Sequence, residues 1–110
     1  MMQVRPLNEV KAELFKGLAH PVRIRILELL DASQEVSVGA LIETLGLEAS
    51  HVSQHLRVLR AYGLVRSERR ASQVYYALAH ESVGQMLAAA RTLLKDVLAD
   101  RISAISDQAN

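Results

Sequence analysis

The chain has 110 residues, a formal net charge of +1, 50% hydrophobic and only 4% aromatic residues, so we expect one domain over residues 1–110 with an aliphatic core. The absence of cysteine excludes a disulfide framework, a thiolate metal site and a thiol redox switch. No apolar run approaches the roughly 20 residues of a membrane span, and the N-terminus lacks the apolar segment of a signal peptide, which favours a cytoplasmic protein with no membrane partner.

The first third of the chain predicts two helices. The first has apolar residues at helical spacing, namely Leu7, Val10, Leu14 and Leu18. The second begins at His20–Pro21, since proline is well tolerated in a first helical turn, and runs to about Ala32.

Two further helices follow, separated by a short connection. Ser37 is the expected N-cap of the third helix, and Gly46 ends it. The fourth helix is predicted over Ala49–Ala61 and closed by Gly63.

The rest of the chain predicts a β-hairpin and a long closing helix. Leu64–Arg70 and Gln73–Leu78 read as strands, and the helical pattern resumes from His80 to about Ser103. The order α-α-α-α-β-β-α is that of a winged helix-turn-helix fold, mainly α with a small β-hairpin.

The helix Ala49–Ala61 has two contrasting sides. Val52, Leu56 and Leu59 share one arc, which we expect to pack on the core. The opposite arc has short polar and amide side chains at its N-terminal end and arginines further on: Ser50, Ser53, Gln54, Arg57 and Arg60. Small polar groups can reach base edges in the major groove while arginines reach phosphate or guanine, so the pattern predicts a DNA-recognition helix. The alternative is an ordinary amphipathic surface helix, but this helix has neither lysine nor acid.

His51 and His55 lie between the two arcs at a spacing that can hold a metal ion. The segment lacks the glutamate of a zinc-protease motif and has no evident third ligand nearby. We therefore predict His51 as a base or phosphate contact and His55 as a partly buried packing residue.

Arginines also gather in the hairpin, where Arg69 and Arg70 lie near its tip. Such a hairpin can follow the phosphate backbone or place an arginine in the minor groove. A solvated basic face is the alternative. The predicted DNA contacts are Ser50, His51, Ser53, Gln54, Arg57, Arg60, Arg69 and Arg70.

The last helix has an apolar stripe wider than one small domain can cover. Small residues at Ala88–Ala90 permit close approach of a second chain, so we predict a homodimer. The predicted interface combines the first and last helices: Leu7, Val10, Leu14, Val83, Leu87, Ala90, Leu94, Val97 and Leu98. The alternative is that the last helix folds back on its own domain.

Four ordered motifs resemble those of the ArsR/SmtB winged-helix repressors. They are Glu13–Arg23, Val52–Leu59, Gly63–Val65 and Val74–Leu78, and the resemblance covers roughly residues 9–100. It implies a homodimer that represses a double-stranded DNA operator and is released by an effector. It also implies base contacts at Ser50, His51, Ser53 and Gln54.

The sensing sites of that family are not intact in this sequence. Positions that hold cysteine in many members carry Ser37 and Gly39, with Ala40 beside them, and the ligand positions of the last helix correspond to His80, Ser82, Leu93 and Asp96. The wing tip has Ala71 where glycine is common.

The effector is therefore left open. No cofactor is predicted, but a Ni or Zn effector is an open alternative, because imidazole and carboxylate groups suit those ions. Its donors would come from His20, His80, Glu81, Asp96 and Asp100. The alternative is that His20 and His80 have only local structural roles.

Two other functional classes are alternatives to a DNA-binding regulator. A winged-helix module that binds a protein partner without DNA has the same scaffold. An enzyme is not predicted, because neither a nucleophile–base pair nor a phosphate-binding glycine loop is recognisable.

Overall fold

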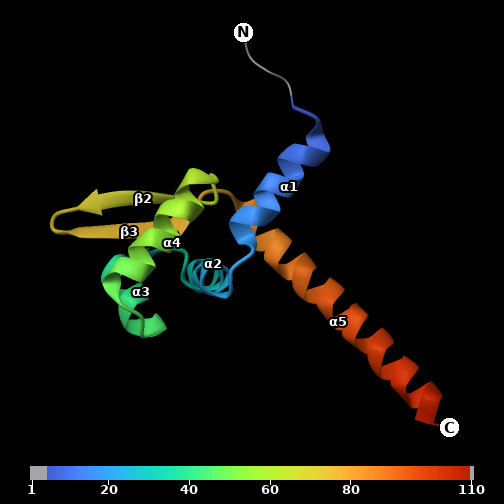
Figure 1. Cartoon of the computed structure of the whole chain (residues 1–110). Coiled ribbons are helices and arrows are strands. Elements are labelled where there is room, and N and C mark those ends of the chain that lie inside the picture. The colour runs from blue at the N-terminus through green and yellow to red at the C-terminus, as the bar shows by residue number, and fades with distance from the viewer. Residues whose placement is uncertain (1–4, 110) are drawn as a thin grey trace.

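The computed structural model describes residues 5–109, and its helices follow the predicted order (Figure 1). The elements are α1 (Leu7–Leu18), α2 (Pro21–Ser33), β1 (Val36–Ser37), α3 (Val38–Leu45), α4 (Ala49–Ala61), β2 (Val65–Arg70), β3 (Gln73–Leu78) and α5 (Glu81–Ala109). The mainly helical fold with a small antiparallel sheet is thereby confirmed. No helix within the described range is long and apolar enough to cross a membrane.

The helix ends are fixed by local interactions that the sequence indicates. Nδ1 of His20 accepts a hydrogen bond from the Val22 amide at 3.1 Å and caps α2. The hydroxyl of Ser37 accepts one from the Ala40 amide at 3.1 Å and caps α3. Gly46 ends α3 with φ of 66°, a left-handed conformation that glycine adopts without a steric penalty. The tight turn that follows sets the angle between α3 and α4.

The sheet contains one strand that the sequence pattern does not predict. β1 pairs with β3, and β3 pairs with β2, giving the antiparallel order β1-β3-β2. Two residues are too few to show an alternating pattern, so β1 exists only through its pairing with Tyr75 and Tyr76. This pairing attaches the β2–β3 hairpin, hereafter the wing, to the segment that leads into α3.

The core lies where α2, α3, α4 and the base of the wing meet. Its fully buried side chains come mainly from α2 and α4: Ile26, Leu27, Leu30, Leu41, Val52, Leu56 and Leu59. Val83, at the start of α5, also belongs to this core with 6% exposure. Val83 was predicted as an interface residue, and that assignment is corrected: α5 packs its first turn against its own domain.

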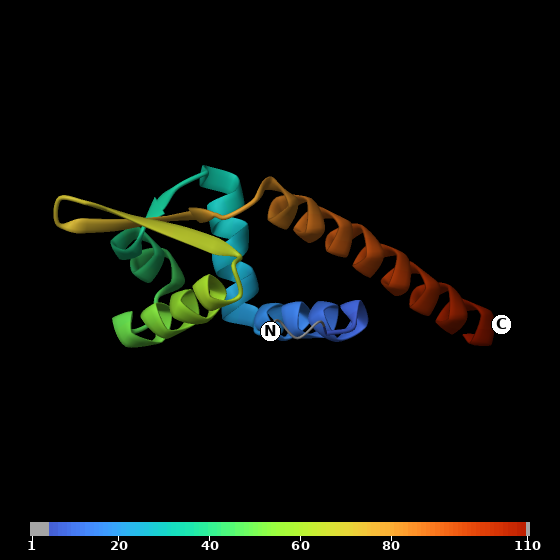
Figure 2. The same cartoon turned by 90° about the horizontal axis from the view of Figure 1, so that it is seen from above.

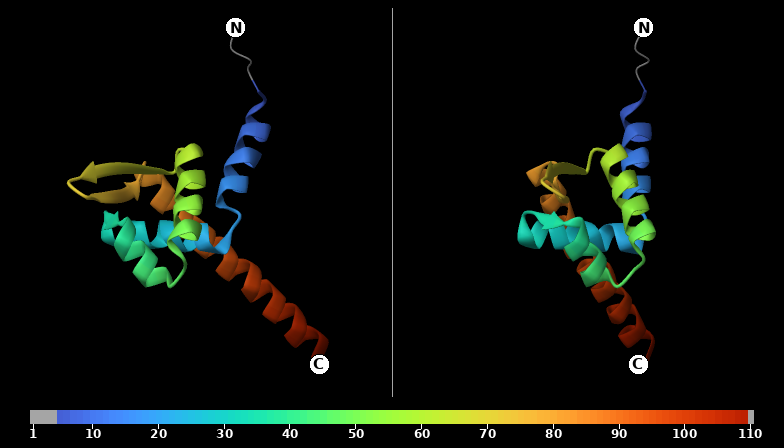
Figure 3. Two further views of the ribbon diagram at one scale, coloured as in Figure 1. Left: turned by 60° about the vertical axis from the view of Figure 1, so that its left-hand side comes forward. Right: turned by 90° about the vertical axis from the view of Figure 1, so that its left-hand side faces the viewer.

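Met86 and Leu87 in the second turn also pack against the core, and beyond them α5 extends away from the domain. The views in Figures 2 and 3 agree that no other element lies beside its C-terminal half. The radius of gyration is 17.5 Å, whereas a compact chain of this length has about 13 Å. The helix also runs to Ala109, past the predicted end near Ser103. Its apolar residues there are exposed: Leu93, Leu94, Val97, Leu98, Ile102 and Ile105.

Gly17 allows α1 to approach the end of α4. A Cβ at this position would lie 2.6 Å from Cγ of Tyr62, the residue that ends α4. Because Cγ is close to the Tyr62 backbone, rotation of the ring cannot relieve such a contact.

We expect Gly17→Ala to lower the free energy of unfolding by about 1–3 kcal/mol through overpacking. Gly39→Ala is the matched control, since its Cβ meets nothing within 4 Å and alanine favours a helix by up to about 1 kcal/mol. Urea denaturation at one protein concentration measures both. A Gly17→Ala protein as stable as the parent would contradict the contact.

Candidate nucleic-acid interface

The two sides of α4 have the exposures that the helical wheel predicts. Val52, Leu56 and Leu59 are buried in the core. Six polar residues on the opposite side are exposed and define the outer face of α4: Ser50, His51, Ser53, Gln54, Arg57 and Arg60. The apolar side fixes the helix against the domain, so the outer face is offered to solvent as a rigid row of hydrogen-bond donors and cations.

His55 packs between α4 and the start of α2, in agreement with the sequence prediction. Its ring centroid lies 4.3 Å from that of His20, and its Nδ1 is buried without a hydrogen-bond partner. Burial lowers the pKa of His55, and the neighbouring His20, Arg23 and His51 lower it further. The neutral imidazole is therefore the form that the fold accommodates.

The described residues bring no three histidine or acidic side chains together as a metal site. His20, one candidate donor, uses Nδ1 to cap α2.

The register of the wing separates its two arginines. Arg70 pairs with Gln73 and Glu68 pairs with Tyr75, so these side chains share one face of the hairpin. Arg69 pairs with Val74, and both lie on the other face together with Tyr76. Arg69 and Arg70 are both predicted DNA contacts, and because neighbouring residues of a strand point in opposite directions, they lie on different faces of the wing.

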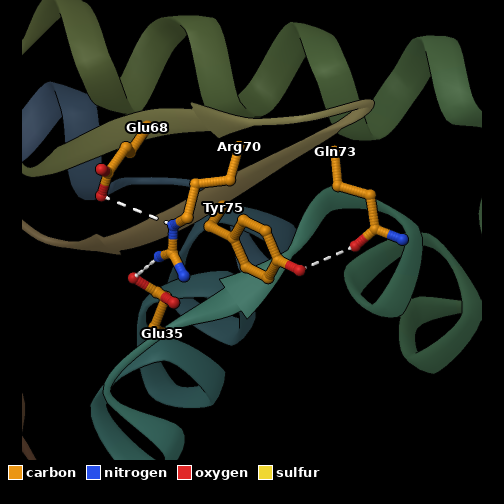
Figure 4. Close-up of polar contacts among 5 residues, drawn as sticks. All are labelled: Glu35, Glu68, Arg70, Gln73 and Tyr75. Carbon is orange, nitrogen blue, oxygen red and sulfur yellow. Dashed lines mark hydrogen bonds and ion pairs between the residues drawn. The ribbon is translucent and has the colours of Figure 1, made fainter.

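Arg70 is engaged by acidic residues rather than left free. Its guanidinium forms an ion pair with Glu35, and its Nε lies 3.7 Å from a carboxylate oxygen of Glu68 (Figure 4). It also stacks on the ring of Tyr75, with 4.3 Å between the guanidinium carbon and the ring centroid. The hydrogen bond with Glu35 raises the pKa of Arg70. Sequence reasoning missed Glu35, because nothing in its own neighbourhood indicates a partner in the wing.

A groove of about 490 Å³ lies between the wing, α3 and α4. Hydroxyl and amide groups line it from three elements: Ser37, Ser53, Ser72 and Gln73. The apolar part of its lining includes Val74 and Tyr76, which share the wing face of Arg69. Ser72 and Gln73 were not predicted as site residues, because only the folded hairpin brings them opposite Ser53.

Known proteins match this chain along nearly its whole length. A family model described as a helix-turn-helix domain matches residues 18–68. The HTH-type transcriptional regulator Rv0081 of Mycobacterium tuberculosis is 46% identical over 107 residues, which are 96% of this chain and 93% of that protein. The HTH-type transcriptional regulator YgaV of Escherichia coli is 38% identical over 88 residues, covering 80% of this chain and 89% of that protein.

Solved structures of related proteins also match the fold of this chain over most of its length. The crystal structure of Rv0081 has a TM-score of 0.82 at 47% identity, covering 90% of this chain and 99% of that one. A solution structure from Mycobacterium bovis has a TM-score of 0.74 at 29% identity, covering 86% and 92%. It is described as the homodimeric winged helix-turn-helix domain of a possible ArsR-family regulator.

Fold, outer face and wing together define a winged helix-turn-helix protein of the class that binds DNA. The chain belongs to the ArsR/SmtB family of transcriptional regulators, as the motifs quoted above imply, and it is not an enzyme.

We expect acid to destabilise the protein through His55. The unfolded chain binds a proton near the ordinary pKa of 6.5, whereas the folded chain binds it only at lower pH. The free energy of unfolding should therefore fall as the pH drops below 6.5. Urea denaturation from about pH 7.5 to about pH 5.5 should show a smaller fall in His55→Gln than in the parent. His80→Gln, altered at an exposed histidine, serves as control, and equal falls in all three proteins would refute the role of His55.

Proposed function

We propose that this chain is a homodimeric transcriptional repressor that reads an operator with two copies of α4. The observation that supports this most directly is the outer face of α4, which has exposed donors over one end and arginines over the other. A relative from Xylella fastidiosa, 38% identical over 86 residues, is named as a biofilm growth-associated repressor.

The outer face suits a division between base and phosphate contacts. Ser50, His51, Ser53 and Gln54 lie in the first turns of α4, the part of a recognition helix that reaches base edges. A Gln amide can form two hydrogen bonds with adenine in the major groove. Arg57 and Arg60 lie further along the helix, where a cation meets the sugar-phosphate backbone.

The exposed apolar residues support dimerisation through α1 and α5. Leu7, Val10, Leu14 and Phe15 are exposed on α1, and six apolar residues are exposed on α5 beyond Leu87. A cavity of about 400 Å³ opens where the two helices diverge, and Leu14, Leu18, Tyr62 and Met86 contribute to its largely apolar lining. A second copy filling this space would bury residues that a monomer leaves in water. The two copies of α4 would then face half-sites about 34 Å apart.

Family membership also supports release of the dimer by an effector. The cysteine positions of the family carry Ser37 and Gly39, so a soft thiolate-bound ion is not the expected class. His80, Asp96 and Asp100 would suit Ni or Zn only if both protomers contributed donors.

For the following test, the operator is obtained by selecting, from a library of random duplexes, the sequence that the protein binds. Gln54→Ala should reduce discrimination against a base change in that operator by about 1–3 kcal/mol, because a bidentate base contact is lost. Fluorescence anisotropy titrations of selected and altered duplexes measure this, with Gln85→Ala, an exposed position on α5, as the control. Unchanged discrimination would rule out base reading by Gln54. If the parent protein shows no salt-dependent DNA binding, the alternative of a winged-helix module that binds a protein partner would be favoured.

The same titration tests whether a metal ion releases the protein from its operator. With Ni, Zn, Co or no metal present we expect equal operator affinity, since two of the four ligand positions of the family's last-helix site carry Ser82 and Leu93, which do not suit these ions. Release by one of these ions would instead demonstrate a histidine and carboxylate site shared between protomers.

Leu94→Glu should separate the protomers. Leu94 is 57% exposed in the single chain, so a carboxylate costs the isolated fold little but is strongly unfavourable inside an apolar interface. We expect a monomer by analytical ultracentrifugation, retained helical circular dichroism and loss of operator binding by more than about tenfold, because the second half-site is lost. Ser103→Glu, about two and a half turns along α5 and so on its opposite side, should remain dimeric. A dimeric Leu94→Glu protein would refute this interface.

A further inference from the structure

The wing has two chemically different faces. One carries Glu68, Arg70, Gln73 and Tyr75, and on this face the Tyr75 hydroxyl donates a hydrogen bond to Oε1 of Gln73 at 2.9 Å. The other carries Arg69, Val74 and Tyr76. Val74 and Tyr76 line the groove that Ser53 of α4 also lines, whereas the only residue of the Arg70 face that reaches this groove is Gln73, next to the turn. The Arg69 face therefore borders the groove beside the recognition helix.

The contacts of Arg70 connect the wing to the helix-turn-helix. Glu35 directly precedes β1, and Ser37, the second residue of β1, is also the N-cap of α3. The ion pair between Arg70 and Glu35 therefore joins the outer part of β2 to the start of α3 (Figure 4). Tyr75 stacks beneath the guanidinium and restricts its position. Together these contacts supplement the short pairing between β1 and β3, which ends at Tyr75 and does not extend to the tip of the wing.

The charges around Arg70 argue against a primary role in phosphate binding. Two carboxylates, Glu35 and Glu68, surround one guanidinium, so this face of the wing tip has no net positive charge. A phosphate would have to displace Glu35 and approach Glu68 at the same time. Arg69, by contrast, is exposed and forms no ion pair within residues 5–109.

We propose that Arg70 is a positioning residue that holds the wing to Glu35, and that Arg69 on the opposite face is the wing's phosphate ligand. This inference rests on the proposed DNA-binding function. In the complex, Arg69 approaches the backbone that lies along the groove between wing and α4, where Ser53 and Ser72 supply further donors. Arg70 does not contact DNA itself but keeps the Arg69 face of the wing at a fixed angle to α4.

The sign of one substitution separates the two roles of Arg70. Removing the negative charge of Glu35 should strengthen DNA binding if electrostatic repulsion is all that matters, because phosphates are repelled less. If Glu35 holds Arg70 and thereby the wing, Glu35→Gln should weaken binding, since the freed wing must be ordered when DNA binds.

The experiment measures operator affinity of the full chain at several salt concentrations. The variants are Glu35→Gln, Arg70→Gln, the corresponding double variant and Arg69→Gln. Glu43→Gln is the matched control, because Glu43 is exposed on α3 and forms no ion pair in the described range. Equal thermal unfolding midpoints establish that each variant folds.

We expect Glu35→Gln and Arg70→Gln each to weaken binding by about two- to fivefold, the range of a surface ion pair. The double variant should lose no more than either single one, because both break the same contact. Their dependence of log affinity on log salt should match the parent, whereas Arg69→Gln should reduce that slope by about 0.9 for its lost phosphate.

A reduced salt slope in Arg70→Gln together with tighter binding by Glu35→Gln would overturn the proposal and make Arg70 a phosphate ligand. Unchanged affinity in both variants would also overturn it, since the ion pair would then have no effect on binding. Absence of any salt-dependent binding by the parent would instead refute the proposed DNA-binding function, which is a distinguishable result.

Discussion

The burial of Val52, Leu56 and Leu59 is the constraint on which the interface depends. Each side chain is fully buried and would individually be costly to expose, on the order of 1.5–3 kcal/mol. Three such residues on one arc leave α4 a single way to pack. The outer face is therefore determined by what the helix buries, and a substitution on that face can alter recognition without altering the position of the helix.

Burial within the chain does not account for α5 as it does for α4. Its first two turns contribute Val83, Met86 and Leu87 to the core, but from Leu93 onward the helix exposes apolar side chains that no other element within residues 5–109 covers. A helix of this kind is uncommon in a stable monomer, because the exposed stripe gains nothing from folding until a second surface covers it. The proposed dimer would account for the length of α5, because a second chain would cover the part of the helix that extends from the domain. Since α1 diverges from α5 at the end of α4, a change in how two chains pack would also change the separation of their recognition helices.

The sequence predicts this fold well wherever the signal is local. Helix α4 is predicted to the residue, since Gly46, Gly63 and a period of 3.6 residues mark it without reference to the rest of the chain. The sequence does not predict β1, because two residues become a strand only by pairing with β3. It places Val83 at an interface, because periodicity shows that a residue is buried but not which surface buries it. The end of α5 is predicted too early, since Ile102 and Ile105 continue the apolar spacing past Ser103 without a capping signal.

The wing shows why charges counted along a sequence overestimate a DNA-binding surface. Five arginines lie between Arg57 and Arg70 with Glu68 as the only acid, which suggests a continuous positive patch. In the fold, Arg70 is matched by Glu35 from a distant part of the chain, and the strand period turns it away from Arg69. Arg57 and Arg60 on α4 and Arg69 on the wing are exposed and form no ion pair within residues 5–109. Surface ion pairs such as that of Arg70 add little to the free energy of unfolding. An ion pair between a hairpin and the start of a helix can nevertheless fix the angle between the hairpin and that helix. Affinity for DNA would then depend on where the cations of this protein are held as much as on how many it has.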